Sequence, residues 1–256
     1  MDFIKDLLVP TNVPLWYVFV LYAIGVLPSF VWLGYYLSKD AHPEPKGMII
    51  RVFLIGMLVT LPVLAIESLI KDSKMFGEFP FSAYMYWFLY FLIGVAFVEE
   101  LFKFFAAKFG AFANKNLDEP VDVMIYMIVA ALGFAAAENI LRILDFSSQA
   151  FADILWINVL RFLDPIFLHA IASGLFGYFI ALSRYQKRNR MLYWLLGLAI
   201  ATVLHTAFNF YIYTVGGSEF GNDSYLLYST IILIGLAFFV SLAFRKLRRM
   251  KNVLQA

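Results

Sequence analysis

The sequence contains no cysteine, and only 15% of its 256 residues are charged. The absence of cysteine excludes disulfides, thiolate metal ligands and cysteine nucleophiles. The low charge argues against a water-soluble domain, in which about 25% of residues are charged. The 20 Lys and Arg residues exceed the 18 Asp and Glu residues by only two. The chain therefore lacks the basic surplus of a nucleic-acid-binding protein, and no nucleic-acid partner is expected.

Apolar and aromatic residues make up most of the chain instead. Hydrophobic residues account for 62% of it, with 28 Phe, 15 Tyr and 5 Trp, and the mean hydropathy is +0.79. One water-exposed domain of this length cannot bury so many large apolar side chains. The composition therefore predicts an integral membrane protein that crosses the bilayer several times.

Seven apolar runs are long enough to cross a bilayer as helices, because a crossing needs about 20 apolar residues. The runs are Pro14–Leu37, Met48–Ile70, Tyr84–Phe112, Val121–Leu144, Pro165–Ser183, Met191–Val215 and Tyr225–Phe244. A further segment, Gln149–Leu163, is short and carries Asp153 and Arg161, so we expect an interfacial or re-entrant helix there. The predicted fold is a single all-α membrane domain over residues 1–256, with about seven spans plus this helix.

The basic residues are divided unequally between the two ends of the predicted spans. Fifteen of the 20 fall in alternate loops and the C-terminal tail, and the other five are Lys5, Lys71, Lys74, Arg142 and Arg161. Loops rich in Lys and Arg remain in the cytoplasm. The distribution predicts a multi-pass cell-membrane protein with its N-terminus outside and its C-terminus in the cytoplasm.

Ionisable residues are rare inside membrane spans, because inserting a charge costs about 2.5–3.5 kcal/mol, so each is by default a functional candidate. The third predicted span contains Glu99, Glu100 and Lys103. At about 100° of helical rotation per residue, Lys103 lies between the two carboxylates and can pair with either one turn away. One lysine neutralises only one of two acids, so the motif keeps more negative charge than a structural ion pair requires.

Three further spans also carry polar groups. Glu138 follows three alanines that allow a neighbouring helix to approach closely, and Arg142 is its ion-pair partner in a purely structural interpretation. His169 lies in the fifth span, and His205 and Asn209 share one face of the sixth. Because lipid disfavours polar groups, we expect carboxylates, imidazoles and an amide from four spans to face the interior of the bundle.

These groups suit a hydrolase, in which a carboxylate activates water and imidazole or amide groups bind a metal or an oxyanion. The sequence has no serine elbow, no aspartate pair on adjacent spans and no His-Glu-x-x-His motif, which disfavours the mechanisms that use them. An ion- or proton-coupled transporter is the main alternative, because buried Glu, Lys and His also build proton relays. No internal repeat supports that alternative, and an inactive scaffold is a third hypothesis.

The order and spacing of the polar residues resemble the PrsW family of intramembrane proteases. The matching pattern, over about residues 84–210, is Glu99-Glu100-x-x-Lys103, Phe134-x-x-x-Glu138, His169 and His205-x-x-x-Asn209. That family is related to the type II CAAX prenyl proteases and bacteriocin-processing proteins. In the prenyl-protease branch a histidine stands at Glu138, and an arginine one residue later replaces Lys103. These departures favour the PrsW family over prenyl-protein or bacteriocin processing, and residues 84–210 are the expected catalytic core.

The resemblance implies an endopeptidase that cuts a membrane-anchored protein substrate in the lipid bilayer, such as an anti-sigma factor at its first cleavage site. It implies that Glu99 is the base that activates water and that Glu100 supports it. It further implies that Lys103 keeps both carboxylates ionised and that Asn209 helps to hold the oxyanion.

The resemblance also implies that Glu138 acts with His169 or His205 to bind a metal or polarise the attacked carbonyl. Together these three residues form a two-histidine, one-carboxylate set, which is a ligand composition of catalytic zinc. The related prenyl proteases imply the alternative, a glutamic mechanism without metal. The sequence leaves both mechanisms open.

The expected depths of the polar groups converge. At 1.5 Å per residue, Glu138 lies about 26 Å and His205 about 21 Å from the cytoplasmic ends of their spans. Glu99 lies near the middle of the third span, and His169 lies within about 6 Å of the outer boundary. We therefore expect the site to open towards the outside and to cut near the outer membrane boundary, with residues 149–163 as a gate or substrate ledge.

Overall fold

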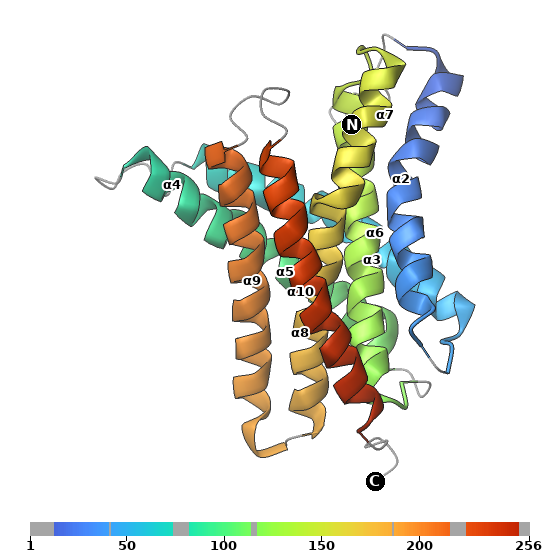
Figure 1. The fold of residues 1–256 in the computed structure, drawn as a ribbon, viewed down its shortest axis with the longest axis vertical. Coiled ribbons are helices and arrows are strands. Elements are labelled where there is room, and N and C mark those ends of the chain that lie inside the picture. The colour runs from blue at the N-terminus through green and yellow to red at the C-terminus, as the bar shows by residue number, and fades with distance from the viewer. Residues whose placement is uncertain are drawn as a thin grey trace.

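The computed structural model describes residues 13–40, 42–73, 82–113, 117–185, 187–215 and 224–250, in which every regular element is helical (Figure 1). The elements are α2 (Leu15–Leu37), α3 (Lys46–Asp72), α4 (Ala83–Leu89), the π-helix η1 (Tyr90–Ala96), α5 (Phe97–Ala107), the π-helix η2 (Lys108–Phe112), α6 (Pro120–Asp145), α7 (Phe151–Leu163), α8 (Pro165–Tyr185), the 3₁₀ turn η3 (Lys187–Asn189), α9 (Arg190–Val215) and α10 (Ser224–Arg248). The predicted all-α membrane bundle is confirmed. Four of the basic residues counted above lie outside the described residues: Lys5, Lys74, Lys115 and Lys251.

Six helical stretches of the described chain are long and apolar enough to cross a membrane: α2, α3, α6, the stretch from α7 through α8, α9 and α10. The remaining predicted span, Tyr84–Phe112, is helical throughout but consists of α4, η1, α5 and η2 in succession. π-helical turns are rare and occur frequently at functional sites. Here η1 directly precedes the helix that carries Glu99 and Glu100, a subdivision that hydropathy does not reveal.

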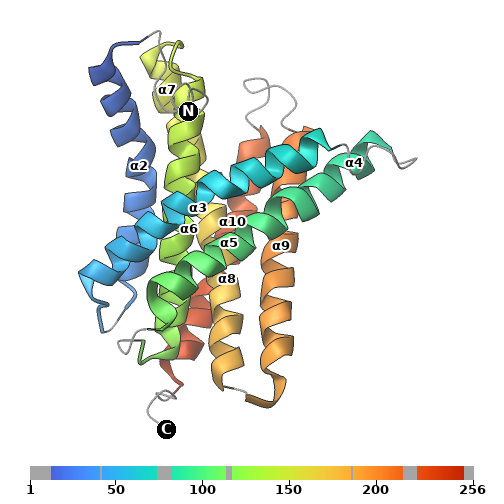
Figure 2. The same cartoon turned by 180° about the vertical axis from the view of Figure 1, so that it is seen from behind.

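Residues 151–163 form a separate helix, α7, as the sequence predicts, and it packs against α2, α6 and α8. Figures 1 and 2 show α7 upright beside α2 and continuing into α8 in the same direction. Trp32 Nε1 of α2 donates to the backbone oxygen of Phe162 at 3.0 Å, and Asn158 Nδ2 of α7 donates to the oxygen of Ile24 at 3.0 Å. Because α7 and α8 run in the same direction, α7 adds no further reversal of the chain between α6 and α8.

The central helix of the bundle is α6. In an 18-residue apolar stretch of α6, 89% is buried inside the protein, whereas 28% of the corresponding stretches of α2 and α10 is buried. Two glycines allow α3 to pack directly against it. A Cβ atom on Gly133 would lie 2.1 Å from the backbone oxygen of Phe53, and one on Gly56 would lie 2.2 Å from that of Ala130. The two backbones are therefore in contact, as small residues permit in membrane helices.

Figure 2 shows α3 and α5 crossing the bundle obliquely, whereas α6, α8 and α9 stand more upright. The tilt of α5 carries its polar face into the interior, where α5 contacts α6, α8 and α9. Residues far apart in the sequence therefore meet near the centre of the molecule.

Candidate active site

Glu99, Glu100 and Lys103 lie on one buried face of α5. The fully buried Lys103 donates from Nζ to Glu99 Oε2 at 2.8 Å and to Glu100 Oε1 at 2.9 Å, as their spacing predicts. Its ammonium also lies 4.5 Å from the ring centroid of Phe134 on α6. Two carboxylates and an aromatic face thus compensate a cation that has lost its water.

His169, in the second turn of α8, connects this motif to α6. Its Nδ1 lies 2.7 Å from Lys103 Nζ. Because an ammonium group only donates, Nδ1 accepts and the ring hydrogen is assigned to Nε2. His169 Nε2 then donates to Glu138 Oε2 at 2.9 Å. One imidazole nitrogen therefore faces α5, and an acid of α6 holds the other.

His205, on α9, is arranged in the same manner. Its Nδ1 lies 3.2 Å from Oε1 of Glu100, a carboxylate that also accepts a 2.6 Å hydrogen bond from Ser173 Oγ. Its Nε2 faces Glu99 and lies 3.9 Å from Oε2. The rings of His205 and His169 are perpendicular, with centroids 5.0 Å apart. Each ring thus directs one nitrogen towards Glu99 and the other towards a different acid.

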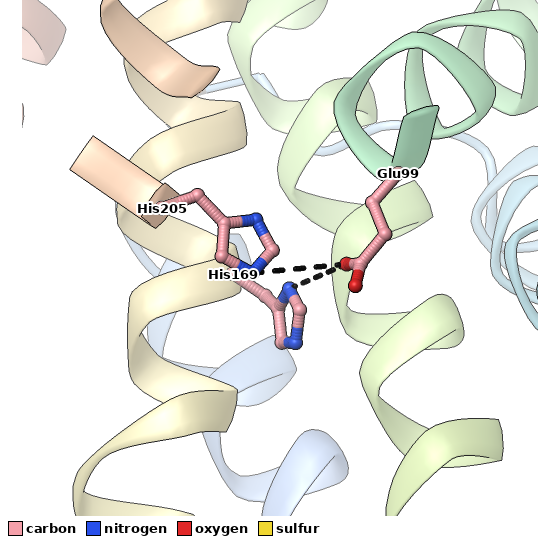
Figure 3. A group of neighbouring side chains, drawn as sticks. All are labelled: Glu99, His169 and His205. Atoms are coloured by element: carbon pink, nitrogen blue, oxygen red, sulfur yellow. Dashed lines mark ion pairs between the residues drawn. The ribbon is translucent and has the colours of Figure 1, made fainter. Parts of the chain in front are cut away.

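Glu99, His169 and His205 form a group in which one ligand atom from each residue lies within 4.8 Å of the others (Figure 3). Glu99 Oε2 is 3.7 Å from His169 Nδ1. Within the described ranges this is the one such group of three or more metal-ligating residues. Two histidines and a carboxylate, with each imidazole held by a further carboxylate, have the composition and outer shell of catalytic zinc sites. The residues present therefore fit a metal ion by composition, and Lys103 Nζ, which donates to Glu99 Oε2 and His169 Nδ1, would have to move to admit it.

Glu138 lies beside this group and, in the described chain, does not belong to it. Besides its bond to His169, it accepts through Oε1 a 2.9 Å hydrogen bond from Arg161 Nη2 of α7. The ligand set expected from the resemblance contained Glu138 in place of Glu99. In the purely structural hypothesis drawn from the sequence, Arg142 was the ion-pair partner of Glu138. The Arg142 guanidinium lies 5.5 Å from the ring centroid of Phe146.

A cavity of about 530 Å³ adjoins the cluster and is bounded by α3, η1, α5 to α9 and the turn at Asp164. Its polar lining comprises Glu67, Glu99, Glu138, Arg142, Arg161, Asp164, His169, His205 and Asn209. The side chain of Glu138 is 32% exposed, whereas those of Glu99 and Glu100 are 8% and 0% exposed. Glu138 is therefore the acid of the cluster that is most accessible from the cavity.

Four of these residues were not predicted as site residues: Glu67, Arg142, Arg161 and Asp164. Glu67 faces the cavity from α3, and its Oε1 is buried with no hydrogen-bond partner among the described residues. The sequence signal for Glu67 was its position as an acid inside a predicted span, but no motif connects Glu67 to the other polar residues. Asn209, one turn after His205, lines the same cavity, as its place in the motif predicts.

An all-helical membrane bundle that places a two-histidine, one-carboxylate group beside an internal cavity has the architecture of an intramembrane hydrolase. The model of the family described as "PrsW family intramembrane metalloprotease" matches residues 44–242, and the chain belongs to this family.

Curated relatives agree with this assignment. The chain is 26% identical to Protease PrsW of Bacillus subtilis over 195 residues, which cover 75% of this chain and 82% of the relative. It is 29% identical to Protease PrsW of Oceanobacillus iheyensis over 191 residues, covering 73% and 80% of the two chains. No solved structure gives a significant match. The predicted resemblance is confirmed, and the protein is an intramembrane protease.

Proposed function

We propose that this protein is a zinc-dependent intramembrane endopeptidase whose metal is held by Glu99, His169 and His205. The observation that carries this proposal is the pairing of each imidazole with a second acid: His169 with Glu138, and His205 with Glu100. Such pairing fixes which ring nitrogen remains available and orients it for a metal. Zinc in this position would supply Lewis-acid polarisation of water and of the scissile carbonyl.

Glu138 is proposed as the base that takes a proton from water in the cavity. It is the most exposed acid of the cluster, and Arg161 and His169 orient its two oxygens. A general base must lie within reach of the water that it deprotonates, and this exposure provides that access. Asn209, on the cavity wall, is proposed to donate its amide to the developing oxyanion.

A metal-free glutamic mechanism is the alternative, and one contact favours it. The Lys103 ammonium donates to Glu99 Oε2 and His169 Nδ1, two atoms that would also bind the metal. The chain thus supplies a positive charge of its own beside them. In that mechanism Glu99 is the base, as the resemblance implies. The two mechanisms carry out the same hydrolysis and differ in their requirement for metal.

The proposed substrate is a membrane-anchored protein that is cut near its outer membrane boundary. The cavity is lined by the C-terminal parts of α6 and α9 and by α7, at the upper end of the bundle in Figure 1. Basic side chains at the opposite end, such as Arg184 and Arg190, favour a cytoplasmic location for that end. Ile157, Leu160 and Arg161 of α7 line the cavity and are proposed as the substrate ledge. First-site cleavage of an anti-sigma factor is the specific form of this activity that the resemblance suggests.

The proposed chemistry is tested with purified protein, a single-span reporter substrate and elemental analysis. We expect about one zinc per chain, loss of cleavage on chelation and recovery when zinc is restored. Full cleavage by protein that lacks metal and resists chelators would reject zinc but leave the protease activity intact. If zinc-loaded protein cuts no membrane-anchored reporter, the proposed substrate class is wrong.

The proposed orientation is tested by thiol labelling, because the chain has no natural cysteine. Tyr213 lines the active-site cavity and is 39% exposed, and Met191 is 69% exposed at the other end of α9. On intact cells, an impermeant thiol reagent should label Tyr213→Cys and leave Met191→Cys unlabelled until the cells are permeabilised. The reverse pattern would place the cavity on the cytoplasmic side.

A further inference from the structure

A second cavity of about 880 Å³ lies towards the opposite end of the bundle and shares no lining residue with the active-site cavity. It is bounded by α5, η2, α8 and α9, near the α8–α9 turn at the lower end in Figure 1. Its walls are mainly apolar and aromatic: Leu101, Phe104, Phe105, Phe109, Phe112, Ile180, Met191 and Trp194. Three cationic side chains, Lys108, Arg184 and Arg190, line it as well.

No ion pair with a carboxylate is found for these three cations in the part of the chain that the structure describes. Two of them contact rings instead. The Arg184 guanidinium lies 4.8 Å from the ring centroid of Phe112, and the Lys108 ammonium lies 5.8 Å from that of Phe104. An aromatic face attracts a cation but does not neutralise it. The cavity therefore combines three positive charges with an apolar wall.

This combination is complementary to an amphiphile with an anionic head and apolar chains. The predicted orientation places this end of the bundle in the cytoplasmic leaflet, which carries anionic lipids. Basic pockets between membrane helices are the sites at which such headgroups bind. The cavity volume lies within the usual range of ligand sites, about 300–1,000 Å³.

We propose that this cavity binds an anionic phospholipid, with its phosphate at Lys108, Arg184 and Arg190 and its acyl chains against the aromatic wall. The cavity lies between the helices that carry the candidate metal ligands, because α5 supplies Glu99 and α8 and α9 supply the two histidines. A bound lipid connects these three helices at their cytoplasmic ends. The binding itself does not depend on the proposed metal chemistry.

The test uses the full chain in nanodiscs that contain equal amounts of phosphatidylglycerol and phosphatidylcholine, with the retained lipids identified by native mass spectrometry. Wild type should retain phosphatidylglycerol in preference to phosphatidylcholine. Each basic group near a membrane surface contributes roughly fivefold to the binding of anionic lipid. The variant with Lys108→Gln, Arg184→Gln and Arg190→Gln should therefore lose about 100-fold in preference, and Arg190→Gln alone roughly fivefold.

The matched control removes three exposed charges from the same end of the bundle but outside the cavity, through Lys39→Gln, Lys46→Gln and Arg245→Gln. Because exposed basic groups also attract anionic lipid, the control should lose some preference, but less than the cavity variant, in which the three removed cations line one cavity. An equal loss in the control and the cavity variant would overturn the proposal, because the preference would then come from the general basic surface. Arg190→Gln, at an exposed position, tests the site if the triple variant fails to fold.

A further arm distinguishes a lipid from free phosphate. Millimolar inorganic phosphate should leave the retained phosphatidylglycerol in place, because phosphate alone cannot contact the aromatic wall. Displacement of the lipid by inorganic phosphate would overturn the assignment to a phospholipid. Equal retention of the two lipids by wild type would do so as well.

Discussion

The two cavities of this bundle compensate charge in different ways. In the active-site cavity, Glu138 pairs with Arg161 and His169, and Glu99 with Lys103, so the ionised groups satisfy one another across four helices. The second cavity presents three cations with no carboxylate partner in the described ranges. Buried charge must be compensated. The first cavity supplies that compensation from within the protein for Glu99 and Glu138. At the second cavity Lys108 and Arg190 are exposed, and an anionic ligand is suited to compensate them together with the partly buried Arg184.

This difference predicts that substitutions have unequal effects at the two ends. Removing one member of the internally paired network leaves its partners uncompensated, so both chemistry and stability should suffer. Substituting an exposed cation at the second cavity relieves repulsion among like charges and should leave the fold intact. The predictions below test this contrast, from the largest expected effect to the smallest.

The largest effect on activity is expected from Glu138→Gln. Glutamine keeps the size of the side chain but cannot accept the proton from water, so turnover should fall by roughly 10²–10⁴-fold. The measurement is cleavage of a single-span reporter at saturating zinc, with Arg190→Gln as the variant from the second cavity. Turnover within about twofold of wild type would reject Glu138 as the base.

The largest effect on stability is expected from Lys103→Ala. It leaves Glu99 and Glu100 as adjacent buried carboxylates without their cation, and breaking a buried ion pair typically costs about 3–5 kcal/mol. The exposed Lys39, which lies 4.5 Å from the ring centroid of Tyr35, provides the control Lys39→Ala, for which little change is expected. Equal thermal stability of Lys103→Ala and wild type in detergent would contradict the internal compensation described above.

A smaller effect, without any change in charge, is expected from Gly133→Ala. The added methyl group would meet the backbone of Phe53 at 2.1 Å and force α3 away from α6, at a cost of about 1–3 kcal/mol. Gly34→Ala is the matched control, because nothing lies within 4 Å of an added Cβ at that site. If both variants melt at the wild-type temperature, the close α3–α6 contact is not required for stability.

The spans were predictable from the sequence because hydropathy is a local property. The predicted run Val121–Leu144 became α6, Pro120–Asp145, and the Glu99–Lys103 pairing followed from helical spacing. The π-helical segment η1 was not predictable, because residue type does not report the register of backbone hydrogen bonds. Asp153 and Arg161 indicated an interfacial or re-entrant helix at residues 149–163, and a helix forms there as α7, but the pairing of Arg161 with Glu138 was not predicted.

The arrangement of the site depended on tertiary packing. Helical spacing made Arg142 the nearest cation to Glu138 in the sequence, yet α7 supplies Arg161 from 23 residues away. The resemblance did not predict which acid lies next to which histidine. Which acid holds which ring nitrogen is decided by the tilt of α5 against α8 and α9. The sequence therefore predicted that Glu99, Glu138, His169 and His205 face one interior, while the structure separates Glu99, inside the metal-type group, from Glu138 beside it.

The most direct test of the central claim is the zinc content of wild type, Glu99→Gln and Glu138→Gln, purified in parallel and measured by elemental analysis. Our account predicts about one zinc per chain in wild type and in Glu138→Gln at saturating zinc, and less than about a tenth of that in Glu99→Gln. Full zinc in Glu99→Gln together with its loss in Glu138→Gln would contradict the account and identify Glu138 as the carboxylate ligand.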